Sequence, residues 1–138
     1  MKRFVLIGTA LLTLSTSMAA DPEIAVNVVV QSDNSVLQGG LRAAIVSRVR
    51  QLPHVTVVAD DNHAMYTIQV VADEDRLGEQ RVGWHSSYVF IQWTPCGDYR
   101  LPVFKAGGPA GGGYRDTEAV VATFVNSFDE ILTRDRQK

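Results

Sequence analysis

The chain has 138 residues, of which 46% are hydrophobic and 20% charged, and its formal net charge is −2. This length and composition fit one globular domain with an ordinary hydrophobic core. The net charge is slightly negative and the basic residues are scattered along the chain. The clustered basic face that nucleic-acid binding requires is therefore excluded, and no nucleic-acid partner is expected.

The first twenty residues have the pattern of a cleaved export signal. Lys2 and Arg3 precede an almost wholly apolar stretch, Phe4–Leu14, and the small residues Ala19 and Ala20 follow. Cleavage is expected after residue 19 or 20. No later apolar run approaches the roughly 20 residues that cross a bilayer, so no transmembrane segment is expected in the mature chain. Retention of Phe4–Leu14 as an uncleaved anchor is the alternative.

Cysteine usage narrows the expected location. Cys96 is the single cysteine, so no internal disulfide is available, and it lies too far from the cleavage site to carry a lipid there. A bacterial periplasm fits this pattern better than secretion as a disulfide-rich protein. Cys96 is expected to be a half-buried free thiol or a partner in an intermolecular disulfide, which leaves a homodimer open.

The first half of the domain reads as strand, helix and strand. Alternating apolar residues predict a strand at Ile24–Gln31. A helix is expected from about Val36 to Gln51, with Ser35 and Gln38 at the spacing of a capping box. A short strand, Val55–Val58, follows. This order predicts a right-handed crossover between parallel strands.

The second half contains further strands and a last helix. Strands are expected at Tyr66–Asp73, Ser86–Trp93 and Tyr99–Phe104, with Glu74–Gly83 as a long hairpin loop. Pro102 confines the last strand to an edge or a bulge. Five glycines in Lys105–Tyr114 predict a mobile loop. A stripe of apolar residues at helical spacing predicts the final helix, from Val120 through Phe124 and Phe128 to Leu132.

These elements predict an α+β fold, a mixed four- to five-stranded sheet with two amphipathic helices packed on one face. The expected organisation is a cleaved signal peptide at 1–19, a single globular domain at 20–134 and a frayed tail at 135–138.

No catalytic set, metal site or cofactor motif is present in the sequence. His54, His63 and His85 form none of the spacings typical of zinc sites, and the glycine segment matches neither phosphate-binding pattern. One alternative is a small hydrolase or metal-dependent enzyme built on His63, His85 and nearby carboxylates. Another is a secreted enzyme inhibitor that inserts an exposed loop such as Gly107–Gly113 into a cleft.

The segment Trp84–Trp93 is aromatic on both faces of its strand. If the helices cover only one side of the sheet, the Tyr88 and Phe90 face is expected to be partly exposed and to bind a partner. Trp84 and the neighbouring Gly107 and Gly111 complete this predicted surface. In the alternative, the aromatic side chains are covered.

The pattern from Ile24 to Asp73, with Ala64-Met65-Tyr66-Thr67-Ile68-Gln69-Val70 in its long strand, resembles small bacterial envelope domains. It is similar to the N-terminal domain of the Tol-Pal propeller protein and to curli-secretion and penicillin-binding-protein-activator domains. The resemblance implies an interaction or assembly role without catalysis, and an envelope or secreted protein as partner. It identifies no functional residue, and Met65 stands where those domains have aspartate.

Overall fold

The computed structural model describes residues 23–138. The predicted signal peptide, 1–19, and the start of the domain at residue 20 lie outside the described residues. In chain order the elements are β1 (Ile24–Gln31), α1 (Ser35–Val49), β2 (Val55–Val58), β3 (Tyr66–Leu77), β4 (Gln80–Cys96), β5 (Tyr99–Gly112), a 3₁₀ turn η1 (Tyr114–Asp116) and α2 (Thr117–Arg136).

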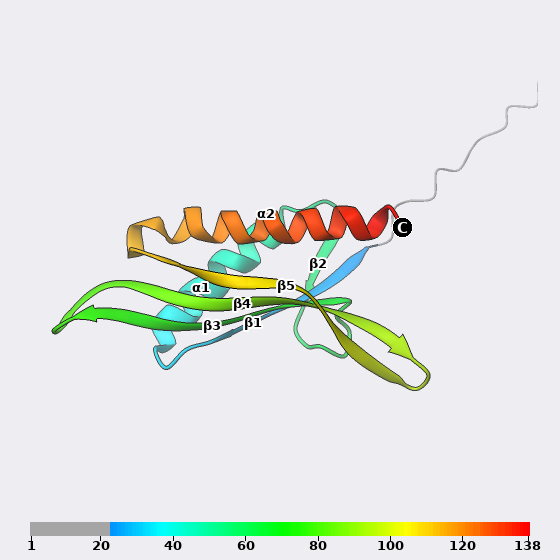
Figure 1. The fold of residues 1–138 in the computed structure, drawn as a ribbon, viewed down its shortest axis with the longest axis horizontal. Coiled ribbons are helices and arrows are strands. Elements are labelled where there is room, and N and C mark those ends of the chain that lie inside the picture. The colour runs from blue at the N-terminus through cyan, green and yellow to red at the C-terminus, as the bar shows by residue number, and fades with distance from the viewer. Residues whose placement is uncertain (1–22) are drawn as a thin grey trace, which may run out of the picture.

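The five strands form one open mixed sheet in the order β2-β1-β3-β4-β5. β1 runs parallel to both β2 and β3, whereas β4 runs antiparallel to both β3 and β5. Both helices lie on the same side of this sheet (Figure 1). The predicted α+β fold and its parallel first crossover are therefore confirmed.

The core lies between the sheet and the helices. Alternate residues of each central strand point toward the helices, and every third or fourth residue of each helix points back, because these are the natural side-chain periods of the two structures. The buried contributions are Val26, Val28 and Val30 from β1, Ile68 and Val70 from β3, Leu41, Ile45 and Val49 from α1, and Val121, Phe124, Val125, Phe128 and Leu132 from α2. The predicted stripe of α2 is thus confirmed.

The expectation that the Tyr88 and Phe90 face is partly exposed is wrong. Phe90 is 0% exposed and Trp84 is 1% exposed. Tyr88 stacks on Phe124 of α2, with ring centroids 5.2 Å apart. The alternation along β4 correctly separates two faces, but α2 covers the one that was expected to be open. Phe90 and Trp84 are therefore not available to a partner, and the half-buried Tyr88 packs against α2.

The glycine-rich segment is part of β5 and does not form the predicted loop. Gly107 pairs with Val89 and Gly111 with His85 along the β4–β5 ladder. A Cβ atom on Gly107 would lie 2.5 Å from the carbonyl oxygen of Tyr88. The two backbones approach so closely here that only glycine fits. Gly107 and Gly111 are therefore required by strand pairing.

Several element boundaries also differ from the prediction. The predicted hairpin loop Glu74–Gly83 is mostly strand, since β3 and β4 are joined by the two residues Gly78 and Glu79. Asn34, rather than Ser35, caps α1 by accepting hydrogen bonds from the first-turn amides. The expected frayed tail begins within α2, which continues to Arg136.

Candidate functional site

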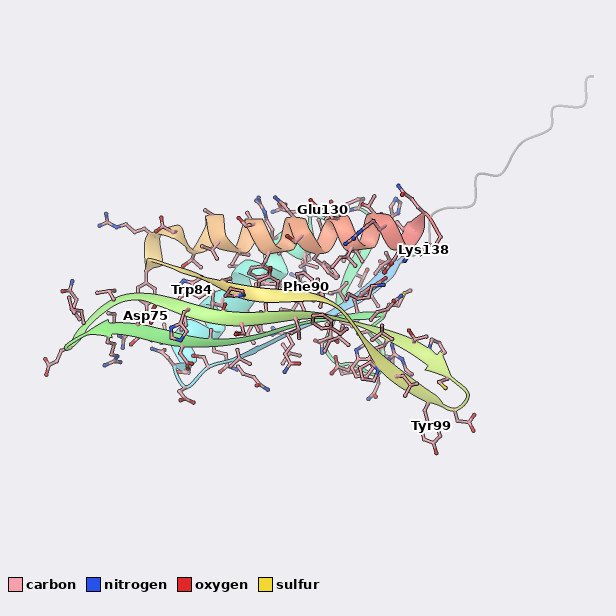
Figure 2. The ribbon with its side chains drawn as sticks, viewed as in Figure 1. Asp75, Trp84, Phe90, Tyr99, Glu130 and Lys138 are labelled. Atoms are coloured by element: carbon pink, nitrogen blue, oxygen red, sulfur yellow. The ribbon has the colours of Figure 1, made fainter. Side chains whose placement is uncertain are left out.

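The outer parts of β4 and β5 form a two-stranded hairpin that projects beyond the helices (Figure 1). We call residues 93–104 the apolar arm. Four large apolar side chains on it are exposed, with exposed fractions of 78% for Tyr99, 68% for Phe104, 52% for Leu101 and 42% for Val103. Figure 2 shows Tyr99 at the tip, directed away from the body of the domain. Exposed apolar side chains gathered in this way are typical of interaction surfaces.

Alternation along β5 places these side chains on two faces of the arm. Tyr99, Leu101 and Val103 lie on one face, and Phe104 lies on the other. β5 is the edge strand of the sheet, as Pro102 predicted, and Pro109 is a second proline on it. A proline has no N–H to offer an incoming strand, so addition of another strand to this edge is disfavoured. The arm is therefore suited to contact a partner through its side chains.

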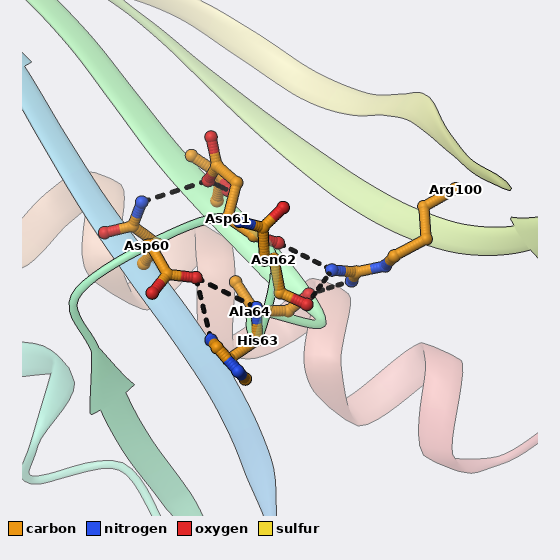
Figure 3. A network of polar contacts seen from close by, with 8 residues as sticks. Asp60, Asp61, Asn62, His63, Ala64 and Arg100 are labelled. Atoms are coloured by element: carbon orange, nitrogen blue, oxygen red, sulfur yellow. Dashed lines mark hydrogen bonds and ion pairs between the residues drawn. The ribbon is translucent and has the colours of Figure 1, made fainter.

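Arg100, which follows Tyr99 near the tip of the arm, ties the arm to the turn between β2 and β3 (Figure 3). Its guanidinium group donates hydrogen bonds to the carbonyl oxygens of Asp61 and Asn62, at 2.6 and 2.7 Å, and to that of Ala64. The same group lies over the indole ring of Trp93, 5.7 Å from its centroid. A planar group with several donors in a fixed geometry is well suited to join three carbonyls at once.

A buried polar network extends this anchor into the sheet. The side chain of Asp61 accepts hydrogen bonds from Asn27 of β1, at 3.0 Å, and from Thr67 of β3, at 2.5 Å. The Trp93 indole donates to the Thr67 hydroxyl at 2.8 Å. These contacts provide hydrogen-bond partners for the side chains of Asn27 and Thr67, which are 4% and 3% exposed. The arm is thus tied to the two central strands.

The histidines that carried the enzyme alternative lie in separate places. The Nδ1 atom of His63 is 2.9 Å from Asp60, and that of His85 is 2.7 Å from Asp75. The turn holding His63 leads into Tyr66, which pairs with Gln92, seven residues along β4 from His85. The two histidines are therefore separated by about 23 Å along the strand.

Each of these pairs is exposed, and residues 23–138 contain no group of three or more His, Cys, Asp or Glu side chains placed to hold a metal ion. A hydrogen bond from His63 lowers the pKa of Asp60, and desolvation opposes this effect. Such a shift accompanies an ordinary exposed ion pair, so it adds no support for catalysis. Cys96 is exposed at the tip of the arm, and within the described chain it forms no disulfide.

A second feature lies at the opposite end of the sheet, where β1 ends and α1 and η1 begin. A cavity of about 140 Å³, which we call the end pocket, opens there. Its lining is Asn34, Val36, Leu37, Gly40, Leu41, Glu74, Arg81, Tyr114 and Thr117. Sequence reasoning missed both the pocket and the arm, because each is assembled by packing between segments that are distant in the chain.

Glu74 organises the polar side of the end pocket. Its carboxylate accepts hydrogen bonds from the Asn34 amide and the Tyr114 hydroxyl, both at 2.7 Å, and pairs with Arg76 at 2.6 Å and Arg81 at 3.3 Å. The hydrogen bond from Tyr114, opposed by burial and assisted by the two arginines, lowers the pKa of Glu74. Glu74 stays ionised and holds the walls of the pocket together.

No family model and no curated protein matches this chain. Among solved structures, the chain is similar to the hypothetical protein CT253 from Chlamydia trachomatis, with 8% identity and a TM-score of 0.52, over 78% of this chain and 96% of that one. It is similar to protein XCC0632 from Xanthomonas campestris, with 9% identity and a TM-score of 0.54, over 85% and 91% of the two chains.

A third similar structure is the PelC dodecamer from Paraburkholderia phytofirmans, with 13% identity and a TM-score of 0.51, over 75% of this chain and 86% of that one. At these identities the likenesses establish a shared fold. Among residues 23–138, no helix combines the length and apolarity that spanning a membrane requires.

Proposed function

We propose that this protein is an exported accessory of the bacterial envelope that acts by binding other proteins, without catalysis. The observation that carries the proposal is the apolar arm. Tyr99 and Phe104 are more than two-thirds exposed, yet Arg100 holds the strand that bears them in a fixed position. A rigid apolar projection loses little conformational entropy on binding, which favours a specific contact with a protein.

Two further observations support this proposal. The export signal predicted at residues 1–19 directs the protein out of the cytoplasm. One protein of similar fold, PelC, is a dodecamer, so the fold is compatible with assembly. The resemblance of the first strands to Tol-Pal and curli-secretion domains points in the same direction and remains a prediction. The proposed location is the periplasm, with release into the medium as the alternative.

The competing functions are less well supported. An enzyme would need its acid–base or metal groups in one place, and His63 and His85 are each paired with different carboxylates in different regions. An inhibitor acting through residues 107–113 would need that segment to be an exposed loop, whereas most of it pairs with β4. We therefore assign partner binding to the apolar arm instead of to the face that carries Tyr88 and Phe90.

Photo-crosslinking in cells tests the proposal. A photoreactive amino acid replaces Tyr99 at the arm tip in one variant and Glu130, on the exposed face of α2, in a matched control (Figure 2). We expect a discrete crosslinked protein adduct in the envelope fraction from position 99 and none from position 130. Absence of an adduct at position 99, or equal adducts at both positions, contradicts the proposal.

A further inference from the structure

We propose that the protein assembles head to tail, with Tyr99 of one copy seated in the end pocket of the next. This inference rests on the proposed function and names its partner as a second copy of the chain. The tip of the arm and one wall of the end pocket are both apolar, so each could cover the other. The arm presents a single exposed aromatic ring at its tip, and the pocket offers an apolar wall of Val36, Leu37 and Leu41.

The two features cannot meet within one molecule. Arg81, in the pocket lining, is the second residue of β4, and Cys96, beside the arm tip, is the last. The fifteen residue steps of strand between them span up to about 50 Å. Figure 1 shows the arm tip and the start of α1 at opposite ends of the sheet. Each apolar surface is therefore left for another molecule to cover.

Gly40 supplies the second, independent observation. Glycine inside a helix costs about 1 kcal/mol relative to alanine, so its presence there calls for a reason. A Cβ atom at Gly40 would meet nothing within 4 Å, so close packing of α1 against a neighbour does not explain the glycine. The fold itself does not need this glycine. Its effect is to keep open the wall of the end pocket, as an incoming side chain requires.

Tyrosine fits the mixed character of this pocket. The ring would contact the apolar wall, while the hydroxyl would lie near the carboxylate of Glu74 and the amide of Asn34 on the polar side. Tyrosine is common at interfaces for this reason, since it combines an apolar body with a polar end. Leu101, two residues along the same face of the arm, would contact the rim beside exposed Val36.

The charges at the two ends of the domain are also complementary. Residues 73–81, next to the pocket, contain four carboxylates and two arginines. Residues 134–138, at the end of α2 nearest the arm, contain three cations and one carboxylate. Within the arm, Asp98 and Arg100 balance each other, so the acidic pocket end disfavours contact with a second pocket end and favours contact with the arm end.

A lipid surface is the less favoured occupant of the arm. Binding to anionic membranes needs free basic residues beside the apolar ones. The two cations closest in sequence to the exposed apolar residues of the arm, Arg100 and Lys105, are engaged within the fold. Arg100 binds the carbonyls of the β2–β3 turn, and Lys105 pairs with Asp135 at 2.7 Å.

A contact that joins two different surfaces of identical copies produces a closed ring or an open filament, depending on the rotation between copies.

Sedimentation velocity on the purified mature protein tests this inference with two matched pairs of variants. Gly40→Leu fills the pocket, whereas Gly39→Leu changes the neighbouring position, which also has open space but is outside the pocket lining. Tyr99→Ser removes the ring and Tyr99→Phe keeps it. We expect Gly40→Leu and Tyr99→Ser to weaken self-association roughly 10- to 100-fold, the loss typical of one buried aromatic contact. Gly39→Leu should assemble like the unmodified protein, and Tyr99→Phe, which loses only the hydroxyl, should assemble more strongly than Tyr99→Ser.

Mixing the two defective proteins gives the sharpest result. The Tyr99→Ser protein retains an intact pocket and the Gly40→Leu protein retains an intact arm, so the mixture should form a 1:1 heterodimer and nothing larger. A monomeric unmodified protein, full assembly by Gly40→Leu, or no heterodimer in the mixture overturns the inference. Tyr99-dependent binding of the monomer to vesicles of phosphatidylethanolamine and phosphatidylglycerol would also overturn it.

The two proposals fail in distinguishable ways. If the purified protein is monomeric but position 99 crosslinks to a different envelope protein in cells, the head-to-tail inference is wrong and the proposed function stands. If position 99 gives no adduct of any kind in cells, the proposed function is wrong as well.

Discussion

Replacement of Phe90 by alanine is the most direct test of where the aromatic side chains of β4 lie. Phe90 is fully buried, and its ring lies 5.2 Å from the rings of Tyr88 and Phe128. Removing a buried phenylalanine side chain loses its transfer free energy and leaves a cavity, for a total of about 3–5 kcal/mol. Total stability of a domain is about 5–15 kcal/mol, so the loss is a large fraction of it.

Phe104 provides a matched control of the same residue type on the adjacent strand. Its side chain is 68% exposed, so Phe104→Ala should change the free energy of unfolding by no more than about 0.5 kcal/mol. The assay is urea unfolding followed by tryptophan fluorescence. With a slope of about 2 kcal/mol per molar urea, Phe90→Ala should lower the midpoint by about 2 M.

The reasoning is refuted if Phe90→Ala and Phe104→Ala have equal, small effects. That outcome would mean that α2 does not cover this face and that Tyr88 and Phe90 are exposed, as the sequence first suggested. If Phe90→Ala fails to fold, Phe90→Leu keeps the experiment informative, because it fills part of the space and should lose less stability.

Three further predictions concern the arm, the glycine-rich strand and pH. Arg100→Ala should leave global unfolding nearly unchanged but accelerate proteolysis within the arm, measured by limited digestion and mass spectrometry, because three carbonyl hydrogen bonds are lost. Gly107→Ala should lower the melting temperature clearly, because its Cβ would collide with the adjacent strand, whereas Gly108→Ala, with its nearest neighbour at 3.5 Å, should be tolerated; equal melting temperatures would contradict this. Burial and then the hydrogen bond to Asp135 raise the pKa of Tyr66, so the stability from this pair is present below pH 10 and lost above it. Tyr66→Phe should flatten the alkaline part of a plot of stability against pH, and an unchanged profile would count against the contact.

The sequence alone was sufficient to place those strands and helices whose apolar residues recur at the period of a strand or of a helix. The bounds of β1 and β2 match those expected, and the stripe of α2 is the buried one, because an apolar face at a strand or helix period can be buried in only one way. The parallel pairing of β1 and β2 also followed from chain order, since a helix between two strands of one sheet is the usual connection of a parallel pair.

The errors arose where a local pattern has two physical meanings. Glycine-rich sequence is typical of loops, but it is also what two closely approaching strands require, and here β4 supplies the second strand. Charged residues at 74–83 resembled a loop, yet exposed strands accept charge on both faces where they extend past the helices. An aromatic strand has two apolar faces, and only the position of α2 decides which one is buried.

The sequence by itself determined the α+β class, and it predicted an export signal and a single domain, because these depend on composition and short-range spacing. Only the tertiary structure decided which surfaces are available. The apolar arm exists because β4 and β5 continue past the helices, and the end pocket exists because Gly40, Glu74 and Tyr114 meet across long sequence separations. Contacts of that kind depend on how segments pack against one another, and no local periodicity encodes them.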